Sequence, residues 1–241
     1  MNVTWYGQSC FKLQNSQQTI LIDPYSPRKH GLRGPNFKAE IIILTDPEDE
    51  KIVRRDLKQE CFLINGPGEY EIKNIFVYGL DFVRKNKRLV IYRLEMDDIQ
   101  FGILGEIDTL LNDQEIEKLD GLDVLFIPVG GGNLSLPARY SPSSVHPRVH
   151  KDKKADEPVR EGEQIDLIDP KRAIEIIDSL EPKLVVPCCF KIPGIRSNLL
   201  PLSQFLNQAG IKDVEKLNKL SLQKKYLIQE QIKIVVLEPG G

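Results

Sequence analysis

Short apolar runs separated by polar turns dominate residues 1–104 and predict a segment that is mostly β-structure. The runs are rich in Val, Ile, Leu and aromatic residues, and Asn, Gly, Pro and Lys interrupt them, as is typical of strands joined by tight turns. Residues 24–35 lose this pattern, carry several basic side chains and two glycines, and predict a loop. Residues 49–57 predict a short helix. We expect strands at residues 2–7, 10–13, 19–23, 40–44, 61–64, 69–72, 76–82, 89–96 and 99–104.

Helical periodicity appears in the second half of the chain. Residues 113–122 predict a brief amphipathic helix. Asp169 and Pro170 form an N-cap and first-turn pair, which opens a second helix that must end before Pro182. We further expect a helix at residues 202–208, closed by Gly210, and strands at residues 124–129, 184–187, 217–222 and 232–237.

The order of these elements predicts the fold class. Each half of the chain is a β-rich segment followed by a helix and further strands, and no linker separates the halves by composition. This order predicts helices packed outside two face-to-face sheets, in a single α/β domain over residues 1–241. With 241 residues, of which 41% are hydrophobic, the chain can bury a sizeable core.

Residues 134–165 interrupt this domain and predict an insertion. The segment contains several prolines, many charges and almost no aliphatic pattern. Two interpretations stay open: a mobile, solvated loop, or a lid that docks an anionic partner. The second rests on its basic residues and histidines, which are Arg139, His146, Arg148, His150, Lys151, Lys153, Lys154 and Arg160.

The overall charge excludes several kinds of partner. Lys and Arg total 33 against 35 for Asp and Glu, so the net charge of −2 provides no field for nucleic acid or anionic lipid. We find no apolar segment long enough to span a membrane and no N-terminal signal, so we expect a cytoplasmic protein. The four cysteines lack the CxxC spacing of a zinc knuckle, and we expect reduced thiols.

One acidic stretch stands out as the candidate site. The apolar run IIIL at residues 41–44 ends in Asp46, and three further acids and a lysine follow within five residues. A buried strand that delivers a functional loop has this pattern. Because neighbouring carboxylates repel one another, a cation, a proton or solvent must separate them.

Five segments, taken in order, resemble one protein family. They are NVTWYGQSCF, TILIDPY, AEIIILTDPEDEK, FGILGEIDTLLNDQEIEKLDGLDVLFIPVGGG and DPKRAIEIIDSLEPKLVVPCCF. In this order they resemble the metallo-β-lactamase superfamily, and within it the small hydrolases similar to ascorbate-6-phosphate lactonases. The resemblance implies a four-layer αββα sandwich. It also implies a zinc centre that is built mainly from histidines.

The positions of that zinc centre are changed in this sequence. The resemblance places the four ligands of the metal loop at Asp46, Glu48, Glu50 and Lys51. It also places the bridging carboxylate at Glu106, the last ligand histidine at Cys189 and the histidine of the first turn at Gln8, and it puts Gln8, Gly68 and Gly131 at the rim of the pocket. The histidines of the chain, His30, His146 and His150, fall in the basic loop and the insertion. The resemblance therefore implies a degenerate site that cannot hold the zinc ions of the family.

Three hypotheses for the acidic stretch follow. In the first, Asp46, Glu48, Glu50 and Glu106 hold Mg²⁺, Mn²⁺ or another divalent ion, because such cations prefer oxygen ligands. The ion activates water against a phosphoester or lactone, with Cys189 nearby. No other cofactor is predicted.

The second hypothesis needs no metal. The ammonium group of Lys51 lies among Glu48, Glu50 and Glu106 and offsets their repulsion. The protein is then a noncatalytic binding module, which is the function that we favour from the sequence.

The third hypothesis gives the stretch no chemical role. Asp46 is then an N-cap and Pro47 lies in the first turn of a short helix. Cys189 has a similar pair of interpretations, as a nucleophile or soft ligand, or as a small buried hydrophobic residue.

Overall fold

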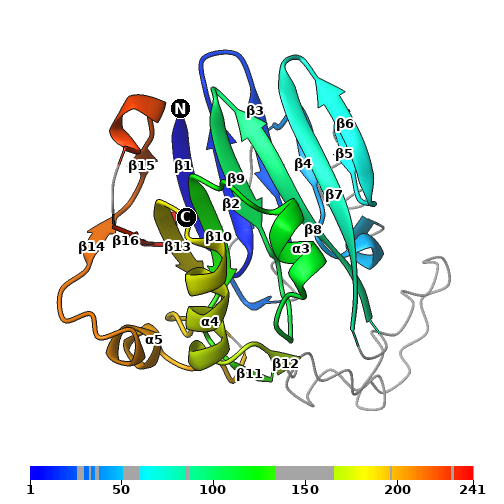
Figure 1. Cartoon of the computed structure of the whole chain (residues 1–241). Helices are drawn as coiled ribbons and strands as arrows, with labels where there is room; N and C mark the ends of the chain where they lie inside the picture. Colours follow the sequence, from blue (N-terminus) through cyan, green and yellow to red (C-terminus); the bar gives the residue numbers. More distant parts are fainter. Residues whose placement is uncertain are drawn as a thin grey trace, which may run out of the picture.

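Two β-sheets lie face to face in the computed structural model (Figure 1). The structure describes residues 1–25, 30–32, 34–35, 38–50, 60–84, 87–133, 166–195, 197–228 and 231–240. In these ranges the smaller sheet has the strand order β15 (Leu220–Ser221), β1 (Asn2–Gly7), β2 (Cys10–Gln14), β3 (Thr19–Ile22), β4 (Ile41–Ile43) and β5 (Phe62–Ile64).

The larger sheet combines a parallel half with an antiparallel half. Its strand order is β14 (Glu215–Leu217), β16 (Lys233–Leu237), β13 (Leu184–Cys188), β10 (Val124–Pro128), β9 (Ile99–Ile103), β8 (Lys87–Met96), β7 (Ile75–Arg84) and β6 (Gly68–Ile72). The strands from β14 to β9 pair in parallel, and those from β9 to β6 pair antiparallel. A separate ribbon pairs β11 (Gly132–Asn133) with β12 (Asp166–Leu167).

The sequence pattern of the first strands explains where they lie. Residues of β1 alternate, so that Val3 and Trp5 are buried between the sheets and their neighbours are partly exposed. Every residue of β3 and β4 is buried, as in strands that are covered on both faces. The face of this sheet that points away from the main core has its own small apolar cluster, which includes Leu21, Ile42 and Leu44.

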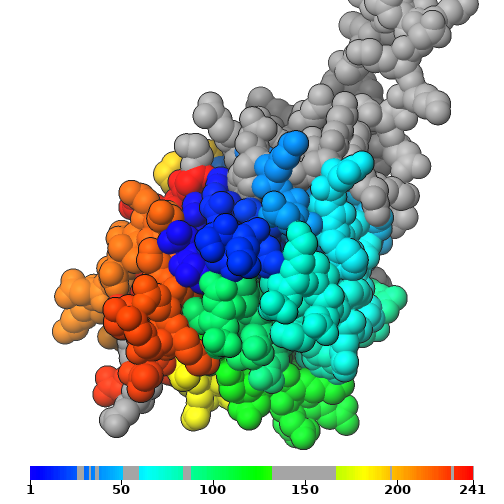
Figure 2. All heavy atoms as spheres, turned by 90° about the horizontal axis from the view of Figure 1, so that it is seen from above, coloured from blue at the N-terminus to red at the C-terminus, as the bar shows by residue number. Residues whose placement is uncertain are grey.

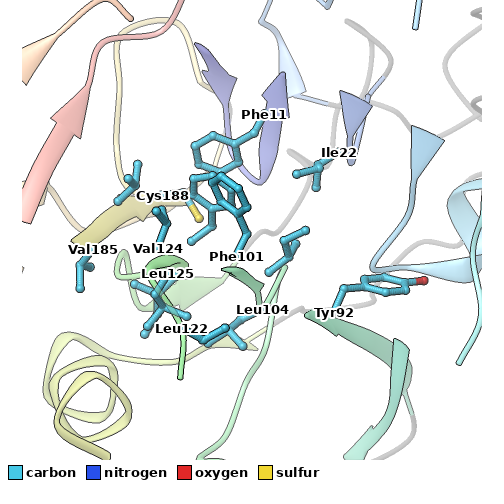
Figure 3. Packing of buried hydrophobic residues seen from close by; sticks show 14 of the residues in the cluster. Phe11, Ile22, Tyr92, Phe101, Leu104, Leu122, Val124, Leu125, Val185 and Cys188 are labelled. Carbon is cyan, nitrogen blue, oxygen red and sulfur yellow. The ribbon is translucent and has the colours of Figure 1, made fainter. Parts of the chain in front are cut away.

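Aromatic side chains join the two sheets in the core. The ring of Phe11 in β2 stacks on Phe126 in β10, with ring centroids 4.2 Å apart. Phe101 in β9 lies against the same Phe126 ring at 5.8 Å. Figure 3 shows Phe11 and Phe101 reaching into this shared core from opposite sheets. Burial of large aromatic surfaces is a main source of stability for such a core.

The described α-helices follow the predicted signals. In α4 (Pro170–Leu180) the side chain of Asp169 accepts a hydrogen bond from the backbone N of Arg172 at 3.0 Å, which confirms the predicted N-cap. The helices α3 (Asp113–Lys118) and α4 lie against the larger sheet (Figure 1), and α5 (Leu202–Gln208) contacts α4. The two sheets with helices outside them confirm the predicted α/β sandwich.

Strand directions bring several loops to one edge. Strands β3 and β4 are parallel, and so are β9, β10 and β13, so the strands of each parallel set end at the same edge. The backbone N of Val90 in β8 donates a hydrogen bond to the carbonyl O of Thr45, just after β4, at 2.8 Å. This bond joins the two sheets beside the strand ends that carry the candidate site.

The strand predicted at residues 217–222 is wrong. The chain instead forms β14 and β15, and these belong to different sheets. The apolar run is broken at Asn218 and Lys219, where the backbone bends, so the chain leaves one sheet and enters the other. Figure 2 shows the resulting neighbourhood of the C-terminal segment, in orange to red, and the N-terminal strands, in blue.

Other predictions fall partly outside the described residues. The helix expected at residues 49–57 is described only at its start, as the 3₁₀ turn η1 (Pro47–Asp49). The insertion at residues 134–165 lies outside the described ranges, so its role as a docking segment stays a prediction. Among the helices that the structure describes, none has the length and apolar character needed to cross a membrane.

Candidate functional site

A small cavity lies where loops from both sheets meet. Its volume is about 10 Å³, which is room for about one water-sized body. The surrounding depression measures about 300 Å³ when its open mouth is included. The cavity is lined by Gln8, Ser9, Asp23, Tyr25, His30, Thr45, Asp46, Asp49 and Glu106.

Strand ends and one tight turn supply these residues. Asp23 follows β3, Thr45 follows β4 and Glu106 follows β9, while Gln8 lies in the turn between β1 and β2. The indole N of Trp5 donates a hydrogen bond to the backbone O of Gln8 at 2.7 Å and so fixes this turn. The site is therefore carried by residues next to paired strands, which favours fixed side-chain positions.

Asp23 is anchored by Thr45 at the floor of the cavity. The backbone N of Thr45 donates to Oδ1 of Asp23 at 2.7 Å, and the Thr45 hydroxyl donates to Oδ2 at 2.6 Å. Burial is the main cause that raises the pKa of Asp23 to about 7; the Thr45 bonds lower it, and the charges of Glu106 and Asp49 add a smaller increase. The protonation of Asp23 therefore depends mainly on its burial and on Thr45, and less on the neighbouring carboxylates.

Gln8 has an unsatisfied side chain in the same place. It is only 1% exposed, and neither its Oε1 nor its Nε2 has a hydrogen-bond partner among the described residues. Buried amide groups in folded proteins almost always have partners, because an unpaired buried amide is destabilising by about 1–3 kcal/mol. The side chain of Gln8 is thus suited to contact a group that enters the cavity.

Glu106 is a second buried polar side chain at the cavity. It is 8% exposed and lines the cavity with Gln8. Its charge, together with that of Asp23, also raises the pKa of the Cys189 thiol, after the larger effects of burial and the hydrogen bond with Cys188. Cys189 therefore lies close to the cavity, although its side chain is fully buried.

The model of a β-lactamase superfamily domain matches residues 2–189, which is most of the chain. The chain belongs to the metallo-β-lactamase superfamily. This membership confirms the resemblance and the αββα sandwich fold that it implied.

Solved structures with the superfamily fold cover nearly the whole chain. One is a Thermotoga maritima protein described as a Zn-dependent hydrolase of the superfamily, at 24% identity and a TM-score of 0.72, over 98% of this chain and 97% of that one. A metallo hydrolase from Ignicoccus hospitalis is 18% identical, with a TM-score of 0.57, over 100% of this chain and 96% of that one. An isothiocyanate hydrolase from Delia radicum gut bacteria is 14% identical, with a TM-score of 0.59, over 100% of this chain and 98% of that one. No curated protein matches the sequence significantly. At these identities the likeness establishes the fold alone.

The residues at the ligand positions of the metal loop do not all lie at the cavity. Asp46 lines the cavity and is also the N-cap of η1, since its Oδ1 accepts from the backbone N of Glu48 at 3.0 Å, which confirms the predicted cap. The side chain of Glu48 is exposed. Glu50 accepts a hydrogen bond from Asn65 Nδ2 at 2.6 Å, and Lys51 lies outside the described residues.

The structure thus brings together only part of the predicted set. Gln8, Asp46 and Glu106 line one cavity, whereas Glu48 and Glu50 do not line it. Of the predicted rim glycines, Gly68 is exposed at the start of β6, and Gly131 donates its backbone N–H to Ile168 O at 3.1 Å. Neither glycine lines the cavity.

Several cavity residues escaped the sequence interpretation. The sequence pattern places His30 in a basic loop, yet the side chain is buried at the cavity. Its ring meets the ring of Tyr25 edge-on, with ring centroids 5.0 Å apart. Asp23 was visible only as part of the Asp-Pro pair in the family resemblance. Asp49 belongs to the acidic stretch but falls at none of the ligand positions of the family. No sequence signal placed these three side chains around one volume.

The donors present do not fit the zinc centre of the superfamily. Catalytic zinc takes nitrogen and sulfur ligands with a carboxylate, and His30 is the histidine that the cavity offers. In the described ranges, no three His, Cys, Asp or Glu side chains come close enough together to hold a metal ion. The acidic side chains that line the cavity are those of Asp23, Asp46, Asp49 and Glu106.

Proposed function

We propose that this protein is a noncatalytic member of the metallo-β-lactamase superfamily that acts as a binding module. The observation that supports this is the composition of the cavity. Four carboxylates, from Asp23, Asp46, Asp49 and Glu106, line it together with the Gln8 amide, which has no partner among the described residues. Of these residues, Asp46 and Glu106 stand at positions that the family resemblance gives to metal ligands. One histidine is not enough for the zinc-bound water on which hydrolysis in this superfamily depends.

Electrostatics supports the same proposal. A cavity lined by acids attracts cations and repels anionic groups such as the phosphate of a phosphoester. Among the described residues that line the cavity, His30 is the one side chain that could carry positive charge toward the oxyanion that develops when a lactone or phosphoester is attacked. The site is therefore suited to hold a cationic group of a ligand or partner, and not to hydrolyse an anionic substrate.

Metal content and activity together test the proposal. Protein purified without chelators is analysed for zinc, manganese, iron and magnesium, and then assayed on an activated phosphodiester and a lactone with and without added Mn²⁺. We expect less than about 0.1 equivalent of each metal and no turnover above buffer. Stoichiometric metal together with turnover that Glu106→Gln abolishes would establish the alternative of a metal-dependent hydrolase and refute the proposal.

Two further predictions belong to this function. Lys51, which follows the acidic stretch directly, is proposed to supply a positive charge for the carboxylates. Lys51→Met should therefore lower the melting temperature at neutral pH, and an unchanged melting temperature would contradict this role.

The cytoplasmic location remains a prediction from the sequence.

A further inference from the structure

Two neighbouring polar groups in the cavity carry an inference about its ligand. Oε1 of Gln8 is buried and accepts no hydrogen bond from a described residue. The carboxylate of Glu106 is also buried. Both groups line a cavity with room for one water-sized body. These two acceptors suit a small group that carries positive charge and hydrogen-bond donors.

Divalent metal ions and ammonium groups differ in the spacing of the acceptors that they require. A divalent metal ion draws its oxygen ligands to about 2.0–2.6 Å, so the ligands crowd within about 3–3.5 Å of each other. An ammonium group donates hydrogen bonds of about 2.8 Å in tetrahedral directions, so its acceptors lie about 4.5 Å apart. No three acidic, His or Cys side chains of the described chain converge enough for a metal ion. A water-sized space that is lined by hydrogen-bond acceptors suits the ammonium group.

We propose that the cavity binds a primary ammonium group, with Oε1 of Gln8 and the carboxylate of Glu106 as acceptors. The inference rests on the proposed function, because a catalytic metal would occupy the same space. The carboxylate of Asp23, fixed by Thr45, adds negative charge at the floor. The open depression of about 300 Å³ leaves space for the carbon chain that carries the ammonium group.

Thermal unfolding of the full chain at pH 8 tests the proposal, with methylammonium chloride as the probe. At this pH the probe is charged and Asp23 is largely ionised. We expect methylammonium at ten times its Kd to raise the Tm by about 3–5 °C over sodium chloride of equal ionic strength. Tetramethylammonium, which has no N–H donor, should not raise the Tm.

Other cations in the same assay supply the contrary outcomes. An equal rise with potassium chloride would show a site for any monovalent cation of this size and overturn the ammonium assignment. A larger rise with Mn²⁺ would overturn it in favour of a metal ion. No response to any cation, in wild type or in the Lys51 variant described below, would leave a bridging water as the sole occupant and also overturn it.

Three variants assign the response to the cavity. Gln8→Met removes the amide acceptor and Glu106→Gln removes the negative charge, each at similar volume, so each should reduce the methylammonium shift at least about fivefold. Glu48→Gln removes an exposed acid of the same stretch that does not line the cavity, and it should leave the shift unchanged. Equal shifts in all three variants would contradict the proposal.

A further variant identifies the source of the ammonium group. If wild type and Lys51→Met both respond, the group comes from an external amine or from a lysine of a partner. If only Lys51→Met responds, the lysine of this chain fills the cavity, and the ammonium chemistry is supported with an internal source. The results of the metal and turnover assays do not depend on the amine response, so the proposed function and this inference can fail separately.

Discussion

The side chain of Asp23 accepts two hydrogen bonds from Thr45, at 2.7 Å from the backbone N and at 2.6 Å from the hydroxyl. The two residues follow the neighbouring parallel strands β3 and β4, so this pair ties the strand ends together at the floor of the cavity. Asp23 adopts a left-handed backbone conformation, with φ of 42°, which such multiple bonds help to hold.

Replacing Asp23 by Asn should change how stability depends on pH. The pKa of Asp23 is about 7 in the folded protein against 3.8 as the ordinary value. The folded state binds the proton more tightly, so this contribution to stability is fully present below pH 3.8 and is lost as the pH rises to 7. Asp23→Asn removes a slope of up to about 1.4 kcal/mol per pH unit in this window. Urea unfolding from pH 4 to 8 measures it, and parallel curves for the two proteins would contradict the assignment.

Asp123 should be important for stability because it binds two lysines. Its fully buried carboxylate accepts from Lys183 Nζ at 2.7 Å, Lys224 Nζ at 2.6 Å and the backbone N of Gln100 at 2.8 Å. Asp123→Asn should lower the unfolding free energy by about 2 kcal/mol, since the two lysines are partly solvated. Asp81→Asn, which breaks an exposed pair with Arg88, should change it by less than about 0.5 kcal/mol.

The same carboxylate predicts an acid-sensitive contribution. Burial alone would raise the pKa of Asp123, but the bond from Gln100 and the two lysines outweigh it and hold the pKa below 3.8. A depressed pKa contributes stability above pH 3.8, which is lost as the pH falls through the folded value. The difference in unfolding free energy between wild type and Asp123→Asn should therefore decrease below about pH 4. A constant difference down to pH 2 would contradict this cause.

Gly105→Ala should disturb the cavity by displacing the side chain of Thr45. Gly105 has φ of 63°, and a Cβ there would overlap the side chain of Thr45. The substitution therefore combines backbone strain with displacement of the residue that holds Asp23, and should destabilise by about 3 kcal/mol or more. Gly210→Ala is the matched control, because φ is 71° and the added Cβ meets nothing within 4 Å. That variant should lose only about 1 kcal/mol. Equal melting temperatures for the two variants would contradict the role given to Thr45.

The thiol of Cys189 should be unreactive in the folded protein. It is completely buried, and burial, the hydrogen bond with Cys188 and the charges of Glu106 and Asp23 all raise its pKa. Only the thiolate reacts with iodoacetamide, so Cys189 should label at least about tenfold more slowly than the partly exposed Cys61. Peptide mapping by mass spectrometry measures both rates. Labelling of Cys189 ahead of Cys61 would support the nucleophile interpretation instead.

The candidate site could be predicted in part. The family resemblance pointed to Gln8, Asp46 and Glu106, and the structure places these side chains around one cavity. It gave the same weight to Glu48, yet the start of the 3₁₀ turn directs that side chain to solvent. Positions in a linear motif do not reveal which side chains turn inward, because one residue of helical rotation changes the direction by about 100°.

The sequence by itself determined the local elements and the fold class. Alternating and continuous apolar runs specify the strands, and the Asp169–Pro170 signal specifies the start of α4, because these preferences act between residues close in the chain. Only the tertiary structure decided that the apolar run after Glu215 is divided between two sheets, and that Asp23, His30 and Gln8 surround one water-sized space. These outcomes depend on the packing of strand ends far apart in the sequence, which no local pattern encodes.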